Sequence, residues 1–415
     1  MSDAGELNLQ TGACIDTATK EDSDALFMHG QHSDEDEFSD ISDSELLKIH
    51  EEAVNEDKGG GKMVQTTEGG SRSSGNCADV AGCSVVSFQI EENKEKSQGH
   101  EGSSHRKRKQ MPIMPMEKYR MKYLWVTNLC SQAWCEQQMM YEFEFPELLK
   151  LEKTDAMNKG ASIHLARELE VHDVVSVTTQ TKEDSWAIKF LNILSMIPVL
   201  QSGARVREFP VFRELNGIFV VGMIDELGYT PKGELELREL KTRTTPTLPG
   251  TSQTVTHQFQ VSLYKLLFDG MVTGLVQPDV FIQHLQLKPD QALGEQVIEH
   301  VKRAGFTAST FGDLLDLTCL NLTFSELPTI DCLKLEYCYQ ADGTSLGFKT
   351  VTFEEEKLME LLNSCLSFWK GQKEAQGVDI EEAWKCRHCS FASICEWRTR
   401  RSEHLSRTGQ SKRTK

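Results

Sequence analysis

The segment 233–241, Gly-Glu-Leu-Glu-Leu-Arg-Glu-Leu-Lys, alternates as a half-buried strand does, yet it carries charge on its apolar face. Because successive side chains of a strand point to opposite faces, Glu239 and Lys241 lie on the side of the two nearby leucines. The preceding segment, 217–227, likewise places Asp225 on its apolar face. A short turn joins the segments, so the sequence predicts two neighbouring strands that bring two carboxylates and one ammonium group to the same rim.

Charged groups on a buried rim need partners, because burying an unpaired charge is costly. One interpretation is a structural ion pair in which Lys241 bridges Asp225 and Glu239. The other is a catalytic site, since two carboxylates can hold a hard cation such as Mg²⁺, which polarises a phosphoryl oxygen and lowers the pKa of its bound water. Lys241 would then stabilise the charge that develops on the phosphate. The second interpretation predicts cleavage of phosphodiester bonds.

The net charge of −18 is concentrated at one end of the 415-residue chain. Residues 1–100 hold 22 Asp and Glu against 7 Lys and Arg, a net of −15, which leaves −3 for the remainder. A segment this acidic and this poor in aromatic residues cannot bury enough apolar surface to fold. We predict an acidic disordered region at 1–112, a folded domain at 113–400 and a basic disordered tail at 401–415.

Two short motifs lie in the acidic region. Residues 38–49 suit a helix that folds on a partner, or one that forms only transiently. The basic cluster His-Arg-Lys-Arg-Lys at 105–109 suits nuclear import or contact with nucleic acid. We expect no secretory signal and no membrane span, because the longest apolar run, 190–200, is too short to cross a bilayer. The expected location is the nucleus, with the cytoplasm as a second one.

Hydrophobic periodicity in the remainder of the chain predicts an α/β domain. Strands are expected at 206–212, 217–227, 233–242, 279–287 and 332–340. Helices are expected at 158–173, 183–203, 257–272, 310–322 and 353–372. These elements predict a mixed sheet flanked by helices, of α/β or α+β type.

A cluster of C-x2-C-x5-C form contains three of the twelve cysteines, Cys386, Cys389 and Cys395. A four-coordinate metal or a cubane cluster needs a fourth ligand. The nearby His388 lies between two of these cysteines, so Cys130 or Cys135, about 250 residues earlier, is the better candidate. Thiolates bind zinc and iron–sulfur clusters alike, and the spacing leaves both open.

Several of these residues resemble the motifs of known nucleases. Asp225 followed by Glu239-Leu-Lys241 resembles the PD-(D/E)xK motif. Residues 160–164, Gly-Ala-Ser-Ile-His, resemble the Gly-x-x-x-His motif of RecB-type nucleases, and residues 260–264, Gln-Val-Ser-Leu-Tyr, resemble their Gln-x-x-x-Tyr motif. Taken singly, the histidine could be an ordinary helix-start residue and the glutamine and tyrosine an amphipathic margin. Their shared order along the chain makes the resemblance specific.

A longer resemblance connects these motifs to the cysteines. The segments CSQAWCE, GASIHLARELE, TKEDSWAIKFLNIL, VGMIDELGYTPKGELELRELKTR, FQVSLYK and GVDIEEAWKCRHCSFASICEWR are similar, in this order, to those of the eukaryotic exonuclease V family, over roughly residues 116–398. The resemblance implies a restriction-endonuclease-like sheet, closed by a [4Fe–4S] cluster that joins the N- and C-terminal parts of the domain. The implied cluster ligands are Cys135, Cys386, Cys389 and Cys395. Cys130 stays open as the alternative to Cys135, and zinc as the alternative to iron–sulfur.

The same resemblance implies roles for the other motif residues. Those that would hold Mg²⁺ are His164, Asp225, Glu239 and, through its main-chain carbonyl, Leu240. Lys241 would orient or activate the attacking water. Those that would contact DNA are Gln260, Tyr264 and Arg243.

The implied activity is that of a Mg²⁺-dependent exonuclease that cuts single-stranded DNA into short oligonucleotides during nuclear DNA repair. We expect a monomer that contacts single-stranded DNA and a single-strand-binding protein. Two other functions stay open on the sequence. One is a catalytically inactive DNA-binding protein with the same fold, and the other is an interaction module built on the metal-binding cysteines.

Overall fold

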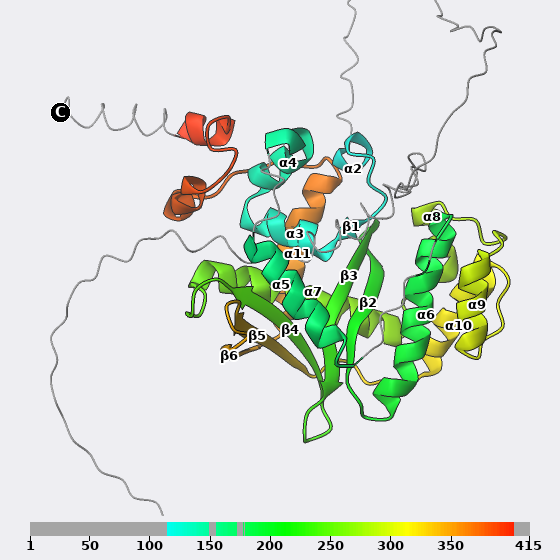
Figure 1. Cartoon of the computed structure of the whole chain (residues 1–415). Helices are drawn as coiled ribbons and strands as arrows, with labels where there is room; N and C mark the ends of the chain where they lie inside the picture. Colours follow the sequence, from blue (N-terminus) through cyan, green and yellow to red (C-terminus); the bar gives the residue numbers. More distant parts are fainter. Residues whose placement is uncertain (1–113, 149–154, 172–176, 178, 402–415) are drawn as a thin grey trace, which may run out of the picture. The chain divides into compact units, whose positions relative to one another are not determined.

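A computed structural model describes residues 114–148, 155–171, 177 and 179–401. The acidic region, the basic cluster at 105–109 and residues 402–415 of the predicted tail lie outside the described residues. A mixed six-stranded sheet flanked by helices organises the described part, which confirms the predicted α/β class (Figure 1). Its strands are β1 (Leu124–Trp125), β2 (Val206–Leu215), β3 (Ile218–Tyr229), β4 (Leu235–Arg243), β5 (Cys332–Tyr339) and β6 (Ser345–Val351).

Strand β3 is the branch point of the sheet. One edge of β3 pairs with antiparallel β2 from residue 218 to residue 227. Its other edge pairs with parallel β1 at residues 220 and 221, and with antiparallel β4 only at residues 226–229. Beyond that point β4 leaves β3 and continues beside parallel β5 as far as Arg243. Strands β3 and β4 therefore part at Asp225, one residue beyond their last paired position.

The β3–β4 hairpin has the face pattern that the sequence predicts. Leu235 and Leu237 are fully buried, and Glu239 and Lys241 are buried on the same face. A short turn precedes them, in which the Thr230 N–H donates to the Glu234 carbonyl at 2.9 Å. The burial of an acid and a base at the end of an apolar strand is thus a real feature of the fold.

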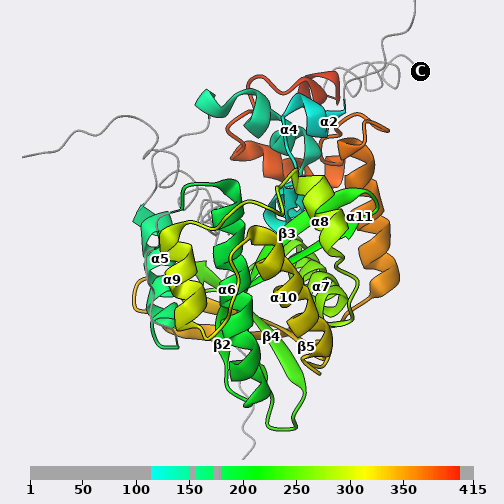
Figure 2. The same ribbon diagram turned by 90° about the vertical axis from the view of Figure 1, so that its right-hand side faces the viewer.

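Helices cover both faces of the sheet. They are α2 (Pro115–Lys118), α3 (Val126–Trp134), α4 (Glu136–Glu144), α5 (Asp155–Glu168), α6 (Lys182–Gln201), α7 (Thr251–Val272), α8 (Pro278–Leu285), α9 (Glu295–Arg303), α10 (Phe311–Phe324) and α11 (Glu355–Trp369), with 3₁₀ segments η2 (Pro146–Leu148) and η3 (Ile380–Arg387). Helix α6 packs on β2 and is covered in turn by α10 (Figure 2). None of these helices is long and apolar enough to cross a membrane.

Helices α5 and α7 lie on opposite faces of β4. The α7 side chain of Gln260 reaches Glu239, whereas Arg167 of α5 reaches Glu336 of β5. Glu336 pairs in register with Leu240, the neighbour of Glu239. Because adjacent residues of a strand point to opposite faces, these two contacts are made on the two sides of the sheet.

The prediction of a strand at 279–287 is wrong. Residues 278–285 form helix α8, which begins at Pro278 and ends before Gln286, a residue in the left-handed conformation with φ of 53°. Proline suits the first helical turn because its missing N–H would be unbonded there anyway. The buried residues Phe281 and Leu285 are four apart, so the apolar pattern fits one helix face as well as a strand.

Other differences concern boundaries and short elements. Helix α5 begins at Asp155 and contains Gly160, after which the sequence predicted its start. Helix α7 begins at Thr251, six residues earlier than predicted. Helix α9 and strand β6 were not predicted, and β6 is mostly exposed, so it carries little apolar signal.

The N-terminal helices are joined to the C-terminal part of the domain (Figure 1). Gln132 of α3 donates to the Cys365 carbonyl at 3.0 Å and accepts from the Trp369 indole at 2.9 Å. Glu136 of α4 accepts the Gln376 N–H at 3.1 Å. These contacts close the described chain into one unit at the end that carries the cysteines.

Candidate active site

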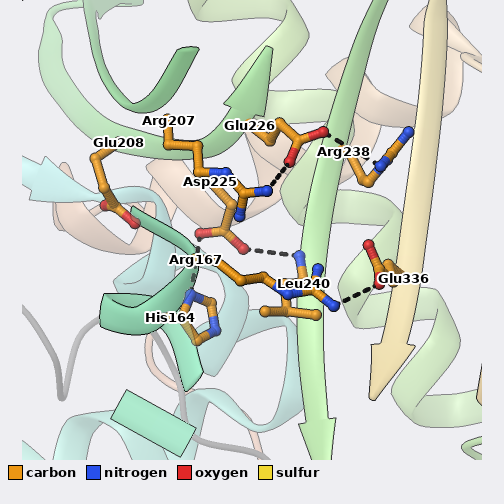
Figure 3. Close-up of a pocket in the computed structure, with 9 residues that line it drawn as sticks. All are labelled: His164, Arg167, Arg207, Glu208, Asp225, Glu226, Arg238, Leu240 and Glu336. Carbon is orange, nitrogen blue, oxygen red and sulfur yellow. Dashed lines mark hydrogen bonds and ion pairs between the residues drawn. The ribbon is translucent and has the colours of Figure 1, made fainter. Parts of the chain in front are cut away.

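Asp225 lies where β3 and β4 separate. Its side chain is buried, and Oδ2 accepts a hydrogen bond from the Leu240 N–H of β4 at 2.7 Å. The pairing of β3 with β4 ends at Glu226 and Arg238, next to Asp225. The bond from Leu240 to Asp225 takes the place of strand pairing beyond that point. A main-chain donor therefore fixes one carboxylate oxygen and leaves the other directed toward the pocket beside it (Figure 3).

His164 approaches this carboxylate from α5. Its Nδ1 lies 3.7 Å from Asp225 Oδ1 (Figure 3). One helical turn on, Arg167 forms an ion pair with buried Glu336 of β5 at 2.7 Å. The ion pair ties α5 to the sheet, and the Gly-x-x-x-His motif of the sequence thus reaches the same place as the acid of β3.

Glu239 is the centre of a second group of side chains, under α7. It is fully buried, and its Oε1 accepts hydrogen bonds from Lys241 Nζ at 3.0 Å and from Gln260 Nε2 at 2.9 Å. Gln260 Nε2 also donates to the Tyr264 hydroxyl oxygen at 3.0 Å. The i,i+4 spacing on α7 therefore serves to support the carboxylate of Glu239.

Close packing positions Tyr264. A Cβ placed on Gly222 of β3 would lie 2.6 Å from Tyr264 Cε1 and 3.0 Å from Val126 Cγ2. The glycine thus lets the tyrosine ring rest against the strand. Gln260 and Tyr264 are both buried. Their hydrogen bonds explain their positions without DNA, and their contact with DNA stays a prediction.

Two more polar residues extend this buried group. Arg243 Nη1 donates to Gln253 Oε1 of α7 at 3.2 Å, and its predicted contact with a DNA phosphate stays a prediction. His257 Nδ1 lies 3.1 Å from the Tyr337 hydroxyl. Burial, followed by the positive charges of Lys241 and Arg243, lowers the pKa of His257 well below its usual value. His257 is therefore neutral at physiological pH.

The predicted site residues fall into two groups on the two sides of β4. The pocket on the α5 side is lined by His164, Asp225 and Leu240, together with Arg167, Arg207, Glu208, Glu226, Arg238 and Glu336 (Figure 3). Glu239, Lys241, Gln260 and Tyr264 form the other group. The two groups meet through the main chain, because Asp225 accepts its hydrogen bond from the residue that follows Glu239.

Glu208 is the pocket residue that the sequence analysis missed. Among the described residues, one set of ligand-bearing side chains has its atoms within 4.8 Å of one another, and it consists of His164, Glu208 and Asp225. Glu208 has φ of 54° in the middle of β2, so it does not follow the alternation of its strand. The only signal in the sequence was an acid within the strand that precedes Asp225.

An arginine cluster forms the far wall of the pocket. Buried Glu226 forms ion pairs with Arg207 at 2.7 Å, Arg205 at 3.1 Å and Arg238 at 3.2 Å. Guanidinium groups bind carboxylates and phosphates with the same planar donors. The pocket thus combines a carboxylate–histidine group with a wall of arginine–carboxylate ion pairs.

The predicted cluster cysteines influence one another electrostatically, Cys135 with Cys386 and Cys389, and these two with Cys395. Burial raises the pKa of Cys135 to about 11, and the charges of Cys389 and Cys386 add to the rise. Burial also raises the pKa of Cys389, and the neighbouring Cys386 and Cys395 raise it further. A thiol from the α3–α4 junction thus lies within electrostatic range of two thiols of the C-terminal segment, and their shared binding of a metal stays a prediction.

Aromatic packing surrounds the thiols. Trp134 and Trp384 meet edge to face at 5.7 Å, and Lys385 Nζ lies 4.2 Å from the centre of the Trp134 ring. Cys130, by contrast, belongs to the hydrophobic core. This placement favours Cys135 as the N-terminal ligand, and the identity of a bound group remains a prediction.

Comparisons with known proteins bear on this architecture. The family described as "Exonuclease V - a 5' deoxyribonuclease" matches residues 114–238, 230–316 and 309–398. A protein of Danio rerio named Exonuclease V is 42% identical over 378 residues, which are 88% of this chain and 93% of that protein. A mixed sheet with a buried acid–histidine pocket, together with these matches, defines a nuclease. The chain belongs to the exonuclease V family.

One solved structure is more distantly similar. The crystal structure of SSO0001 covers 66% of this chain and 86% of its own length, at 14% identity and a TM-score of 0.34. Values this low do not establish a shared fold.

Proposed function

We propose that the chain is a Mg²⁺-dependent exonuclease that degrades single-stranded DNA from its 5′ end and releases short oligonucleotides. The observation that carries the proposal is the meeting of Asp225, His164 and Leu240 where β3 and β4 part. The family description, a 5′ deoxyribonuclease, supports DNA as the substrate and the 5′ end as the start. The preference for single strands comes from the sequence resemblance.

The donor atoms of the pocket fit a hard divalent cation. Carboxylate and main-chain oxygens are the ligands that Mg²⁺ prefers, and an imidazole extends the set to Mn²⁺. His164, Asp225, Glu239 and the Leu240 carbonyl are the proposed ligands. The cation would polarise the phosphodiester and make its bound water more acidic.

The neighbouring residues have distinct proposed tasks. The Leu240 N–H holds one oxygen of Asp225, so that the carboxylate keeps its orientation in the pocket. Lys241 and Gln260 hold Glu239 from the α7 side. The ammonium group of Lys241 is the proposed group that orients the water and balances charge at the phosphate.

We further propose that Cys135, Cys386, Cys389 and Cys395 bind a [4Fe–4S] cluster, which closes a restriction-endonuclease-like fold. The support is that Cys135, at the α3–α4 junction, lies within electrostatic range of Cys386 and Cys389, which in turn lie within range of Cys395. The raised pKa values of Cys135, Cys386 and Cys389 mean that a bound metal must displace protons from these thiols, as metal–thiolate sites do. Zinc in the same thiols is the second candidate, and metal analysis of the purified protein separates the two.

The cellular part of the proposal rests on the sequence resemblance. It comprises action in nuclear DNA repair, a nuclear location with the cytoplasm as a second one, a monomeric state and contact with a single-strand-binding protein.

The decisive experiment uses single-stranded DNA labelled at its 5′ or 3′ end, with Mg²⁺ present. The Asp225→Asn variant should lose cleavage while keeping its fold, and Asp279→Asn, which changes an exposed acid of α8, should cleave as the parent does. Circular single-stranded DNA should resist the parent protein. Equal cleavage by the parent and Asp225→Asn would reject the catalytic assignment and leave an inactive DNA-binding protein as the alternative.

A further inference from the structure

We propose that Glu208 is a further ligand of the divalent cation, beside His164 and Asp225. The three side chains come from β2, α5 and β3, and their ligand atoms lie within 4.8 Å of one another. The identity of the cation as Mg²⁺ is taken from the proposed function, and the inference rests on it in this respect. It adds a residue that neither the nuclease motifs nor the family match assigns.

The register of the sheet explains how Glu208 reaches the site. Strand β2 pairs with β3 through Arg207 with Glu226 and through Phe209 with Ile224. Glu208 stands between these two pairs, level with Asp225, and its left-handed backbone interrupts the regular pairing at that point. Strand β2 thus brings a second carboxylate beside Asp225, on the edge away from β4.

The backbone of Glu208 is unusual for this position. Its φ of 54° is left-handed, a conformation that costs free energy for any residue with a Cβ and is uncommon within a strand. A glycine or asparagine would suit the backbone better. Strand formation alone therefore does not explain a glutamate here, whereas a requirement for its carboxylate does.

Two other carboxylates of the pocket form ion pairs with arginines. Glu226 is paired with three arginines and Glu336 with Arg167. Glu208 instead extends toward His164 and Asp225 (Figure 3). His164, Glu208 and Asp225 thus bring together an imidazole and two carboxylates, whose oxygens are the donors that Mg²⁺ and Mn²⁺ prefer.

Glu208 also differs from Glu239. The carboxylate of Glu239 accepts from Lys241 and Gln260 on the α7 side, and Glu239 does not line the pocket. Glu208 lines it directly. Of these two glutamates, Glu208 is the one whose carboxylate lies in the pocket beside His164 and Asp225.

The test is direct binding of Mn²⁺ to the purified protein, followed by electron paramagnetic resonance of the free ion. Glu208→Gln keeps the size of the side chain and removes its charge, and we expect Mn²⁺ affinity to fall about tenfold or more. The control is Glu214→Gln on the same strand, whose carbonyl oxygen can still accept from the Gly217 N–H at the turn. Equal Mn²⁺ affinity of the two variants would overturn the assignment.

A second variant separates binding from folding. Glu208→Gly relieves the left-handed backbone, so its melting temperature should equal or exceed that of the parent while Mn²⁺ affinity falls. Weak binding together with a lowered melting temperature would indicate a structural role and overturn the proposal.

Asp225→Asn distinguishes this inference from the proposed function. If it loses Mn²⁺ affinity and cleavage while Glu208→Gln keeps both, the inference about Glu208 fails and the proposed function stands. If Asp225→Asn also retains both, the proposed function itself fails.

Discussion

Gln260 and Glu239, 21 residues apart in the chain, are joined by a buried hydrogen bond of 2.9 Å between the side-chain amide and the carboxylate. The same amide nitrogen donates to Tyr264, so helix α7 is fastened to β4 at an acidic residue of the proposed site. Neighbours that orient a metal ligand commonly affect affinity or turnover without touching the substrate. The contact therefore leads to a kinetic prediction.

Gln260→Leu should lower kcat about 10- to 100-fold and leave KM for single-stranded DNA nearly unchanged, because Glu239 loses a donor while the pocket surface stays the same. Steady-state kinetics on end-labelled DNA would measure this. Tyr264→Phe removes only the hydroxyl that accepts from Gln260 and should show a smaller decrease. A raised KM with unchanged kcat would instead show that Gln260 contacts the DNA.

Gly222→Ala should destabilise the fold by about 1–3 kcal/mol, since the new methyl group would lie 2.6 Å from the Tyr264 ring and overpack the interface. Urea unfolding gives this free energy directly. The matched control is Gly228→Ala on the same strand, where the nearest atom is Cγ of the flexible Arg205 at 3.3 Å. If both variants lose equal stability, close packing against Tyr264 is not the reason for the glycine.

Stability should decrease below about pH 6.5, partly through His257. Its pKa is lower in the folded chain than in the unfolded chain, so the unfolded state binds more protons as the pH falls through the unfolded value. One such group changes the free energy of unfolding by at most about 1.4 kcal/mol per pH unit. His257→Gln should show a shallower decrease in urea unfolding between about pH 7 and pH 5. An unchanged slope would show that His257 does not carry this effect.

Cys135→Ala should abolish iron and sulfide binding and the broad visible absorbance of a cluster, because it removes the thiol that lies with the C-terminal three. Cys130→Ala changes a core cysteine of α3, the helix that ends just before Cys135, and should leave both signals intact. Metal and sulfide analysis with absorbance spectra would decide. Loss of signal in Cys130→Ala but not in Cys135→Ala would reverse the ligand assignment, and a colourless zinc protein would favour the zinc alternative.

The residue pattern alone predicted the hairpin that carries the site. Alternation from Leu235 to Arg238 is a strong strand signal, and face parity correctly buried Glu239 and Lys241 beyond it. Face parity did not predict the direction of the Asp225 side chain. The strands separate at this residue, and its carboxylate lies in the pocket on the α5 side. Alternation describes a paired strand and does not report where pairing ends.

Other parts of the site depend on tertiary structure that local patterns do not encode. The i,i+4 spacing of Gln260 and Tyr264 predicted a shared helix face, but only the packing of α7 shows that this face meets Glu239. Glu208 escaped notice because its left-handed backbone interrupts the period of β2. Helix α8 was assigned as a strand because eight residues are too few to separate the two periods.

The contacts between α4 and the segment after α11 have a consequence for synthesis. Glu136 and Gln376, 240 positions apart, meet through a hydrogen bond, and the thiol of Cys135 lies within electrostatic range of Cys386 and Cys389. A ribosome must therefore translate nearly the whole domain before its first helices find their final neighbours. In a nascent chain the strands of the sheet could pair before the contacts of α4 with the segment after α11 can form. Insertion of any metal cluster at these cysteines would then be a late step of maturation.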